Sequence, residues 1–260
     1  MLKAAIESVL AQDFKNFELV VVDDGSTDHT ADILKSFSQD IVVIRQDNQG
    51  VSAARNAGIR ATTGPLVAFL DSDDLWLPQK LAVQVDFFNA NPDARICQTE
   101  EIWVRNNIRV NPKMRHQKIS GMIFEPSLEL CLVSPSAVMI RRSLFETVGR
   151  FDESLPACED YDLWLRTSCR YPIYLIDTPL IIKRGGHVDQ LSRMPGLDKY
   201  RIRSIKKVIE SNLLSTAQYH AAVKVLQMKC AIYAAGCIKR GKKNEAAHYK
   251  ALAENYTPRQ

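Results

Sequence analysis

The chain has 260 residues, of which 46% are hydrophobic and 25% charged, a composition typical of a globular protein with a buried core. The formal net charge is only +4, and no dense basic stripe interleaved with aromatic residues precedes the C-terminal third, so a dedicated nucleic-acid binder is not expected. A mildly basic surface still suits anionic substrates or an anionic membrane face.

Cysteine usage and apolar runs set the expected location. The six cysteines are scattered, form no Cys-x-x-Cys pair and have mostly apolar neighbours, so we expect reduced, mostly buried thiols. No signal peptide is visible after Met1, and no apolar run approaches the ~20 residues of a membrane span. These features predict a cytoplasmic protein that is soluble or, at most, peripheral at the cytoplasmic membrane face.

Strand and helix patterns alternate through about residue 90. Apolar, β-branched runs predict strands at 17–22, 41–44 and 66–70, and helical patterns lie at 2–11, after Thr27, at 51–61 and after Pro78. This alternation predicts an α/β domain with a mostly parallel sheet flanked by helices. The stretch 94–141 has shorter strands and irregular loops. A helix is expected at 160–169, and strands near 173–176 and 180–182.

Beyond Pro195 the pattern changes to helices alone, at 200–214, 216–238 and 244–254. We therefore expect an α/β domain over residues 1–195 and an all-helical C-terminal appendage over 196–260. The appendage carries scattered basic residues at Lys206, Lys207, Lys239, Arg240, Lys242 and Lys243. Its amphipathic helices could pack on the α/β domain with a solvated basic face, pair with a helical partner, or lie on an anionic membrane.

The first chemistry-bearing motif is Asp23-Asp24-Gly25-Ser26, directly after the strand at 17–22. Carboxylates at the carboxyl end of a parallel strand lie where α/β sheets bind ligands, and they can accept hydrogen bonds from a base or ribose. The alternative is a polar strand-to-helix turn with local side-chain capping.

The second motif, Asp71-Ser72-Asp73-Asp74, follows the strand at 66–70. Three carboxylates within four residues repel one another, and a divalent cation bridged to substrate phosphates would relieve that repulsion. The alternative is a solvated acidic turn with no ligand.

Two further motifs lie downstream. Glu159 and Asp160 begin a predicted helix, where the helix dipole favours anions, so they are either simple capping residues or a site with Asp160 as a general base. Gly185-Gly186-His187 allows close backbone approach to a ligand, and His187 is a metal ligand, a phosphate donor or an ordinary surface histidine.

The order of these motifs carries more information than any one of them. Together with the block Asn48-x-Gly50-Val51-Ser52-x-Ala54-Arg55-Asn56-x-Gly58 and the later strings Ser134 to Arg142 and Val148-Gly149-Arg150-Phe151-Asp152-Glu153, they closely resemble the family 2 glycosyltransferases of the GT-A fold. The resemblance covers roughly residues 1 to 195. It implies a Rossmann-like GT-A sheet and an inverting nucleotide-sugar transferase.

The resemblance also implies roles for individual residues. Asp23 and Asp24 would contact the nucleotide base and ribose, and Arg55 and Asn56 belong to a block that lines the donor site. Asp71 and Asp73 match the Asp-x-Asp element, with Asp71 facing the ribose or a phosphate. Mg²⁺ or Mn²⁺ would be bound by Asp73 and His187, and Asp160 matches the catalytic base.

The expected reaction is transfer of a hexosyl or N-acetylhexosaminyl group from a nucleotide sugar, expected to be a UDP-sugar, to a hydroxyl of a saccharide or lipid-linked acceptor. The resemblance also implies a role in cell-surface polysaccharide or glycan synthesis. Two other protein classes that place aspartates after strands fit less well. A nucleotidyltransferase would carry a glycine-rich phosphate loop, which this chain lacks, and a receiver-type signalling domain would be far shorter.

One departure from the family pattern lies at the start of the chain. Relatives begin with a strand ending in Pro-x-Tyr-Asn, whereas this sequence starts at the helix that follows it, so a central first strand is expected to be missing from the sheet. The chain is then either a late-assigned start or a truncation. This keeps a second function open, a non-catalytic or impaired nucleotide-sugar-binding module.

Overall fold

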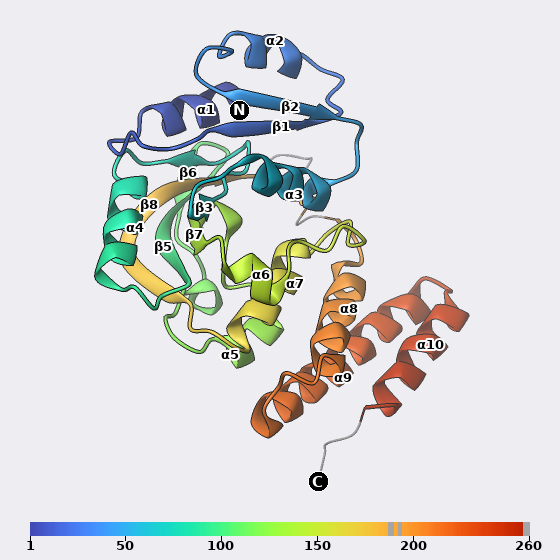
Figure 1. The fold of residues 1–260 in the computed structure, drawn as a ribbon. Helices are drawn as coiled ribbons and strands as arrows, with labels where there is room; N and C mark the ends of the chain where they lie inside the picture. The colour runs from blue at the N-terminus through green and yellow to red at the C-terminus, as the bar shows by residue number, and fades with distance from the viewer. Residues whose placement is uncertain (187–189, 192–193, 257–260) are drawn as a thin grey trace.

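The computed structural model describes residues 1–186, 190–191 and 194–256, and it consists of an α/β body and a helical lobe (Figure 1). The body begins with α1 (Leu2–Leu10), β1 (Val20–Asp24), α2 (Thr30–Lys35), β2 (Val42–Gln46) and α3 (Val51–Ala61). Strands β1 and β2 are parallel, and α2 lies on the crossover between them. This βαβ unit is the arrangement that the alternating sequence patterns predict.

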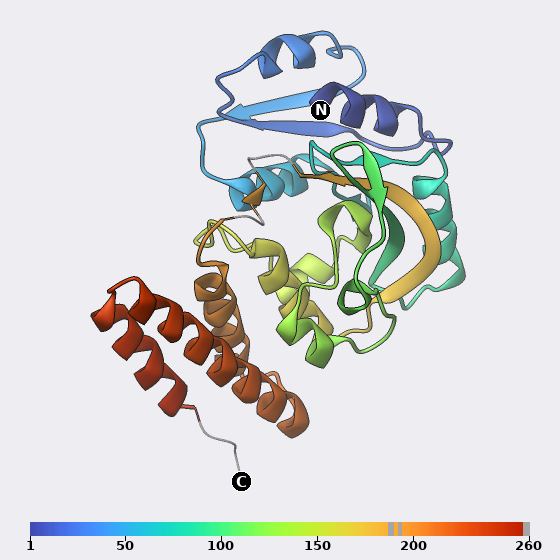
Figure 2. The same cartoon turned by 180° about the vertical axis from the view of Figure 1, so that it is seen from behind.

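A second sheet holds the remaining strands in the order β3-β7-β5-β8-β4, with β6 paired to β5. These strands are β3 (Leu66–Ala68), β4 (Leu75–Trp76), β5 (Ile96–Arg105), β6 (Ile108–Val110), β7 (Val138–Arg141) and β8 (Tyr174–Gly185). The strands expected at 173–176 and 180–182 form one continuous strand, β8, which curves around the body (Figure 2). The predicted α/β class is confirmed.

The pairing is more mixed than the expected mostly parallel sheet. The β1–β2 and β5–β8 pairs are parallel, and the other pairs are antiparallel. The reason is that the strand–helix alternation ends after residue 90, and later connections reverse the chain within the sheet. At the β5–β6 turn, Asn106 and Asn107 have φ angles of 49° and 62°, as a tight hairpin requires.

Within the described residues, no strand hydrogen-bonds β1 or β2 to the larger sheet. Helix α1 is instead fixed to the segment after β4. The buried Gln12 side chain donates to the Leu77 carbonyl at 2.8 Å and accepts from the Leu81 backbone amide at 2.9 Å. This small network orients the N-terminal helix against the body.

Successive side chains along β5 and β7 point to opposite faces of the larger sheet. Each face packs against helices. Ile96 and Ile140 pack in one cluster with Trp164, and Cys97 and Met139 pack in another that includes helix α4. The helices of the body after α3 are α4 (Lys80–Ala90), α5 (Phe124–Glu129), α6 (Leu144–Val148) and α7 (Glu159–Ser168), with 3-10 turns η1 (Met114–His116) and η2 (Pro135–Ala137).

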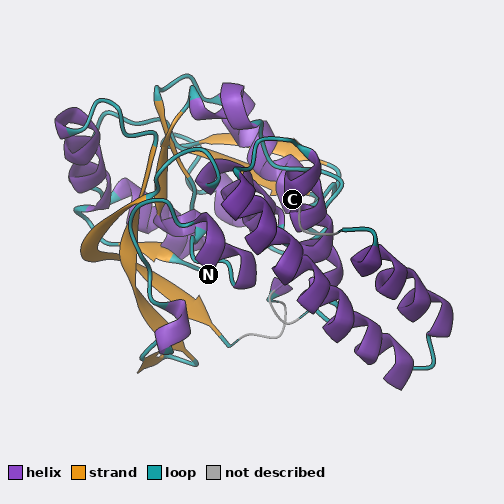
Figure 3. Ribbon diagram, turned by 90° about the horizontal axis from the view of Figure 1, so that it is seen from below, coloured by secondary structure: helices purple, strands orange, loops and turns teal. Residues whose placement is uncertain are grey.

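The C-terminal lobe consists of helices alone (Figure 3), namely α8 (Leu197–Glu210), α9 (Thr216–Lys239) and α10 (Lys243–Glu254). It shares one hydrophobic core with the body, because Tyr161 and Leu165 of α7 cluster with Ile205 of α8 and Leu226 of α9. The helical appendage is therefore present and packed on α5 and α7. The boundary at residue 195 stays a prediction.

Helix α9 corrects the expectation that no apolar run approaches membrane-spanning length. Its 24 residues are long and apolar enough to cross a membrane by length and composition, because the helix continues through the isolated Lys224 and Lys229. Half of its most apolar stretch is buried inside the chain. The six cysteines are free, and four of them are buried, in agreement with the expectation of reduced, mostly buried thiols.

We predict that Gly25→Ala destabilises the fold more than Gly241→Ala. Both glycines have left-handed backbones, with φ of 77° and 73°, which costs a side-chain-bearing residue ~1–2 kcal/mol. A Cβ at Gly25 would also lie 2.8 Å from the Asn48 backbone nitrogen, whereas Gly241 faces open space. We expect about 1–3 kcal/mol more loss at Gly25, measured by urea unfolding. Equal losses would show that the Asn48 contact imposes no constraint.

Candidate active site

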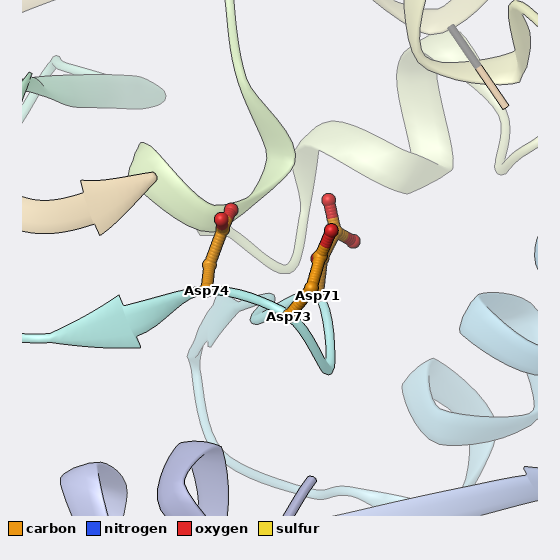
Figure 4. A group of neighbouring side chains, drawn as sticks. All are labelled: Asp71, Asp73 and Asp74. Carbon is orange, nitrogen blue, oxygen red and sulfur yellow. The ribbon is translucent and has the colours of Figure 1, made fainter. Parts of the chain in front are cut away.

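Three carboxylates gather on the turn between β3 and β4 (Figure 4). Asp71, Asp73 and Asp74 each offer an oxygen, and these atoms all lie within 4.8 Å of one another. The turn is closed by the Asp74 backbone amide, which donates to the Asp71 carbonyl at 3.0 Å. The structure thus brings together the acidic residues of the second motif, in a donor set of the kind that hard divalent cations prefer.

Asp74 anchors this turn to the rest of the site. Its side chain accepts hydrogen bonds from the Ser136 hydroxyl at 2.7 Å and from the Arg184 backbone amide at 2.9 Å. Burial, together with the charge of Asp71, raises the pKa of Asp74 to about 7. Keeping all three carboxylates ionised therefore costs free energy, and a bound cation would lower that cost.

Arg55, on helix α3, joins the acidic turn to the start of α7. Its guanidinium lies 2.7 Å from Asp71 Oδ1 and 2.5 Å from Glu159 Oε1. The Arg55 and Glu159 side chains are 12% and 6% exposed, so this ion pair is shielded from water, whereas Asp71 is 36% exposed and meets solvent on its other side. Arg55 and Asp71 are therefore neighbours, as the sequence suggests, but Glu159 joins them as a partner that local sequence presents only as a helix cap.

Asp160 lies beside this pair, in the first turn of α7. Its Oδ1 accepts from the Tyr161 backbone amide at 2.7 Å, and its Oδ2 lies 3.6 Å from the Cys131 Sγ, whose single proton also has the Val133 carbonyl as an acceptor at 3.2 Å. Burial and the charge of Asp160 raise the pKa of Cys131 well above its ordinary value, so the thiol keeps its proton. Cys131 is a site residue that sequence reasoning missed, because its neighbours in the chain are apolar.

The end of β8 adds two cations to the acidic turn. Lys183 donates to the Ser134 hydroxyl at 2.9 Å, and the Arg184 side chain donates to the Asp73 carbonyl. Burial lowers the pKa of Lys183, but the charges of Glu101, Asp74 and others outweigh it and raise the pKa. Neither cation was predicted, although their position just before Gly185-Gly186 was a usable signal.

Asp23 and Asp24 are the last two residues of β1, which spans Val20–Asp24 instead of the expected 17–22, and both are tied into local hydrogen bonds. Asp23 accepts from the Ser26 backbone amide at 2.9 Å and is 4% exposed. Asp24 accepts from the Gln46 side chain at 2.7 Å and from the Gly50 backbone amide at 2.7 Å. Asp24 thus shapes the loop that leads into α3, and contacts of either carboxylate with a base or ribose stay predictions.

Asn56 is buried below the site. Its amide nitrogen donates to the Phe151 carbonyl at 2.9 Å, and its amide oxygen accepts from the Phe151 backbone amide at 3.1 Å. This pairing fixes the loop that leads to α7, and a direct donor contact stays a prediction. His187, the other expected metal ligand, lies outside the described residues.

Comparison with known families gives this arrangement its context. Residues 1–149 match the family described as Glycosyl transferase family 2. The chain belongs to this family. It is also 34% identical over 194 residues to an uncharacterized glycosyltransferase of Rickettsia prowazekii, covering 73% of this chain and 61% of that protein. This family 2 chain therefore spans about three-fifths of the length of that relative.

Another relative has a printed activity. The family 2 chain is 32% identical over 166 residues to the UDP-Glc:alpha-D-GlcNAc-diphosphoundecaprenol beta-1,3-glucosyltransferase WfgD of Escherichia coli, covering 63% of each protein.

Solved structures support the GT-A fold of this family 2 chain. The S. aureus TarS fragment 1–349 in complex with UDP-GlcNAc superposes with a TM-score of 0.70 and 19% identity, covering 88% of this chain and 68% of that one. A mannosyltransferase from Pyrobaculum calidifontis, in complex with GDP-Man and Mn²⁺, superposes with a TM-score of 0.57 and 19% identity, covering 99% and 77%. At this identity the likeness concerns the fold.

We predict that Arg55→Met lowers the free energy of unfolding by about 3–5 kcal/mol, because it leaves the buried Glu159 carboxylate without its counter-charge. Urea unfolding measures this loss. Arg60→Met is the matched control on the same helix, since Arg60 is 54% exposed and lies 3.9 Å from Glu153, and it should cost less than ~1 kcal/mol. Similar losses for the two variants would contradict a clamp at Arg55.

Proposed function

We propose that this chain is a metal-dependent, inverting glycosyltransferase that moves a sugar from a nucleotide sugar, preferentially a UDP-sugar, to an acceptor hydroxyl. One observation carries the proposal. Arg55 joins Asp71, on a carboxylate cluster suited to a cation and diphosphate, to Glu159, whose neighbour Asp160 is suited to act as a base. Donor-binding and proton-accepting groups therefore lie on two sides of one guanidinium.

The carboxylate cluster fits Mg²⁺ or Mn²⁺, since both prefer oxygen ligands and bridge carboxylates to phosphates. Asp73 is the ligand we assign first, and His187 the second. When bound, the cation would offset negative charge on the leaving diphosphate. Asp74 supports this fit, because burial and then the charge of Asp71 raise its pKa, and a nearby cation would favour its ionised form.

The basic groups of β8 suit the diphosphate itself. Arg184 Nη2 is buried and has no hydrogen-bond partner within the described part of the chain, so it is an unused donor beside the acidic turn. Arginine donors bind phosphate oxygens through charge-assisted hydrogen bonds. We propose that Arg184 donates hydrogen bonds to the diphosphate oxygens. Lys183 would offset part of the negative charge of the carboxylate cluster.

We assign Asp160 as the general base. It accepts the proton of the acceptor hydroxyl, while the hydroxyl oxygen bonds to the anomeric carbon of the donor sugar. The bond from that carbon to the diphosphate oxygen breaks, and its electron pair leaves with the nucleoside diphosphate. Attack opposite the leaving group inverts the anomeric configuration. The Tyr161 amide orients the carboxylate, and the Cys131 thiol lies beside it.

The relatives suggest the substrate class. The names of two E. coli relatives, WfgD and WfaP, state transfer from UDP-Glc to a GlcNAc-diphosphoundecaprenol acceptor. We therefore propose a hexosyl or N-acetylhexosaminyl donor, a saccharide or lipid-linked acceptor, and a role in cell-surface glycan synthesis. A cytoplasmic location, at the inner face of the membrane, belongs to the same proposal.

We predict that Asp160→Asn lowers kcat by about 10²–10⁴-fold while leaving donor affinity nearly unchanged, because the amide cannot accept the proton but keeps the size of the carboxylate. Transfer from a panel of radiolabelled UDP-sugars measures kcat, and calorimetry measures donor affinity. Near-normal turnover by the variant would refute the base assignment. Donor binding by the wild type without turnover on any donor would favour a binding module.

We predict that Asp73→Ala weakens Mn²⁺-dependent UDP binding by at least tenfold, since it removes a ligand whose interaction is worth several kcal/mol. Titration calorimetry with UDP, with and without Mn²⁺, measures the difference. Asp93→Ala, at an exposed aspartate after α4, is the control and should bind UDP as the wild type does. Unchanged affinity in Asp73→Ala would remove this residue from the metal site.

A further inference from the structure

Charge is divided unequally along this chain. Residues 196–260 carry 13 basic and 4 acidic side chains, a formal charge of +9, whereas residues 1–195 carry 21 and 26, a formal charge of −5. The small positive net charge of the chain is therefore the sum of an acidic α/β body and a strongly basic helical lobe. Figures 1 and 2 show this lobe projecting from the body.

Helix α9 presents an exposed apolar stripe on this basic lobe. Met228, Ile232 and Ile238 are 42%, 56% and 51% exposed, although each is a large apolar side chain. With the exposed Ala231 and Ala235, they recur at helical spacing on one side of α9, opposite the face that packs on α8 and α10. Among the residues that the structure describes, none covers this side of α9.

Basic side chains bound the stripe at both ends. Lys224 and Lys239 are exposed and fall on the same side of the helix, and Arg240, Lys242 and Lys243 follow at its C-terminal end. Helix α9 contains no aspartate or glutamate. An apolar stripe between lysines that can extend toward headgroups is the pattern of a helix lying in a membrane interface.

We propose that the α9 stripe docks on an anionic lipid bilayer, with the apolar side chains at the headgroup–acyl boundary and the lysines among anionic headgroups. A second copy of this chain is a poorer occupant, because any symmetric pairing of two α9 stripes brings lysine to lysine. The acidic body would be repelled by the same bilayer, so the charge division also orients the lobe toward it. The proposal depends on this surface and not on the proposed transfer reaction.

Flotation of the full chain with lipid vesicles tests the proposal. We expect binding to vesicles of phosphatidylcholine and phosphatidylglycerol in equal parts, no binding to phosphatidylcholine alone, and loss of binding as salt rises. Absence of binding to the anionic vesicles at low salt would overturn the proposal. So would a concentration-dependent dimer, seen by light scattering, that Ile232→Ser abolishes.

Two pairs of variants distinguish binding through the α9 stripe from binding through the net charge of the chain or through exposed apolar side chains elsewhere. Lys224→Gln with Lys239→Gln should lower vesicle affinity by roughly an order of magnitude or more, whereas Lys3→Gln with Lys35→Gln, on α1 and α2, should change it little. Ile232→Ser should weaken binding, whereas Ile108→Ser, at a 68% exposed isoleucine of β6, should not. Equal losses within either pair would refute the stripe, provided that thermal unfolding shows all four proteins folded.

Discussion

The site depends on one shielded guanidinium. Arg55 lies 2.7 Å from Asp71 and 2.5 Å from Glu159, and the side chains of Arg55 and Glu159 are only 12% and 6% exposed. Removing Arg55 would leave Glu159 charged and poorly solvated, which costs far more than the intact pair contributes. The turn after β3 and the first turn of α7 are therefore held as one unit, with the proposed metal ligands on one side and Asp160 on the other.

Local signals in the sequence were sufficient for the elements that carry this unit. Helix α3 has the bounds predicted from its small-residue pattern, 51–61, and the acidic turn follows a short buried strand as expected. The direction of strand pairing was not predictable in the same way, because it depends on contacts between distant segments. Strand β8 pairs in parallel with β5 but antiparallel with β4, and nothing within residues 174–185 encodes that difference.

The missed site residues share one cause. Cys131, Lys183 and Arg184 matter because folding places them against Asp160 and the acidic turn, whereas their neighbours in sequence are ordinary core or strand residues. The reverse holds for Asp24 and Asn56, whose motif positions suggest ligand contacts but whose polar atoms bond within the chain. Residue type and spacing identify which segments build a site, while tertiary packing decides which atoms remain available to a ligand.

Helix α7 connects the site to the helical lobe. Asp160 faces the site, but the next residue, Tyr161, is buried in the core shared with α8 and α9, and its hydroxyl donates to the Leu128 carbonyl at 2.6 Å. Adjacent residues of a helix point in different directions, so α7 can present Asp160, the proposed base, to one side while it anchors the lobe on the other. The lobe is thus a packed extension of the α/β body. If α9 docks on a bilayer as proposed, the bilayer would also fix the direction in which Asp160 faces.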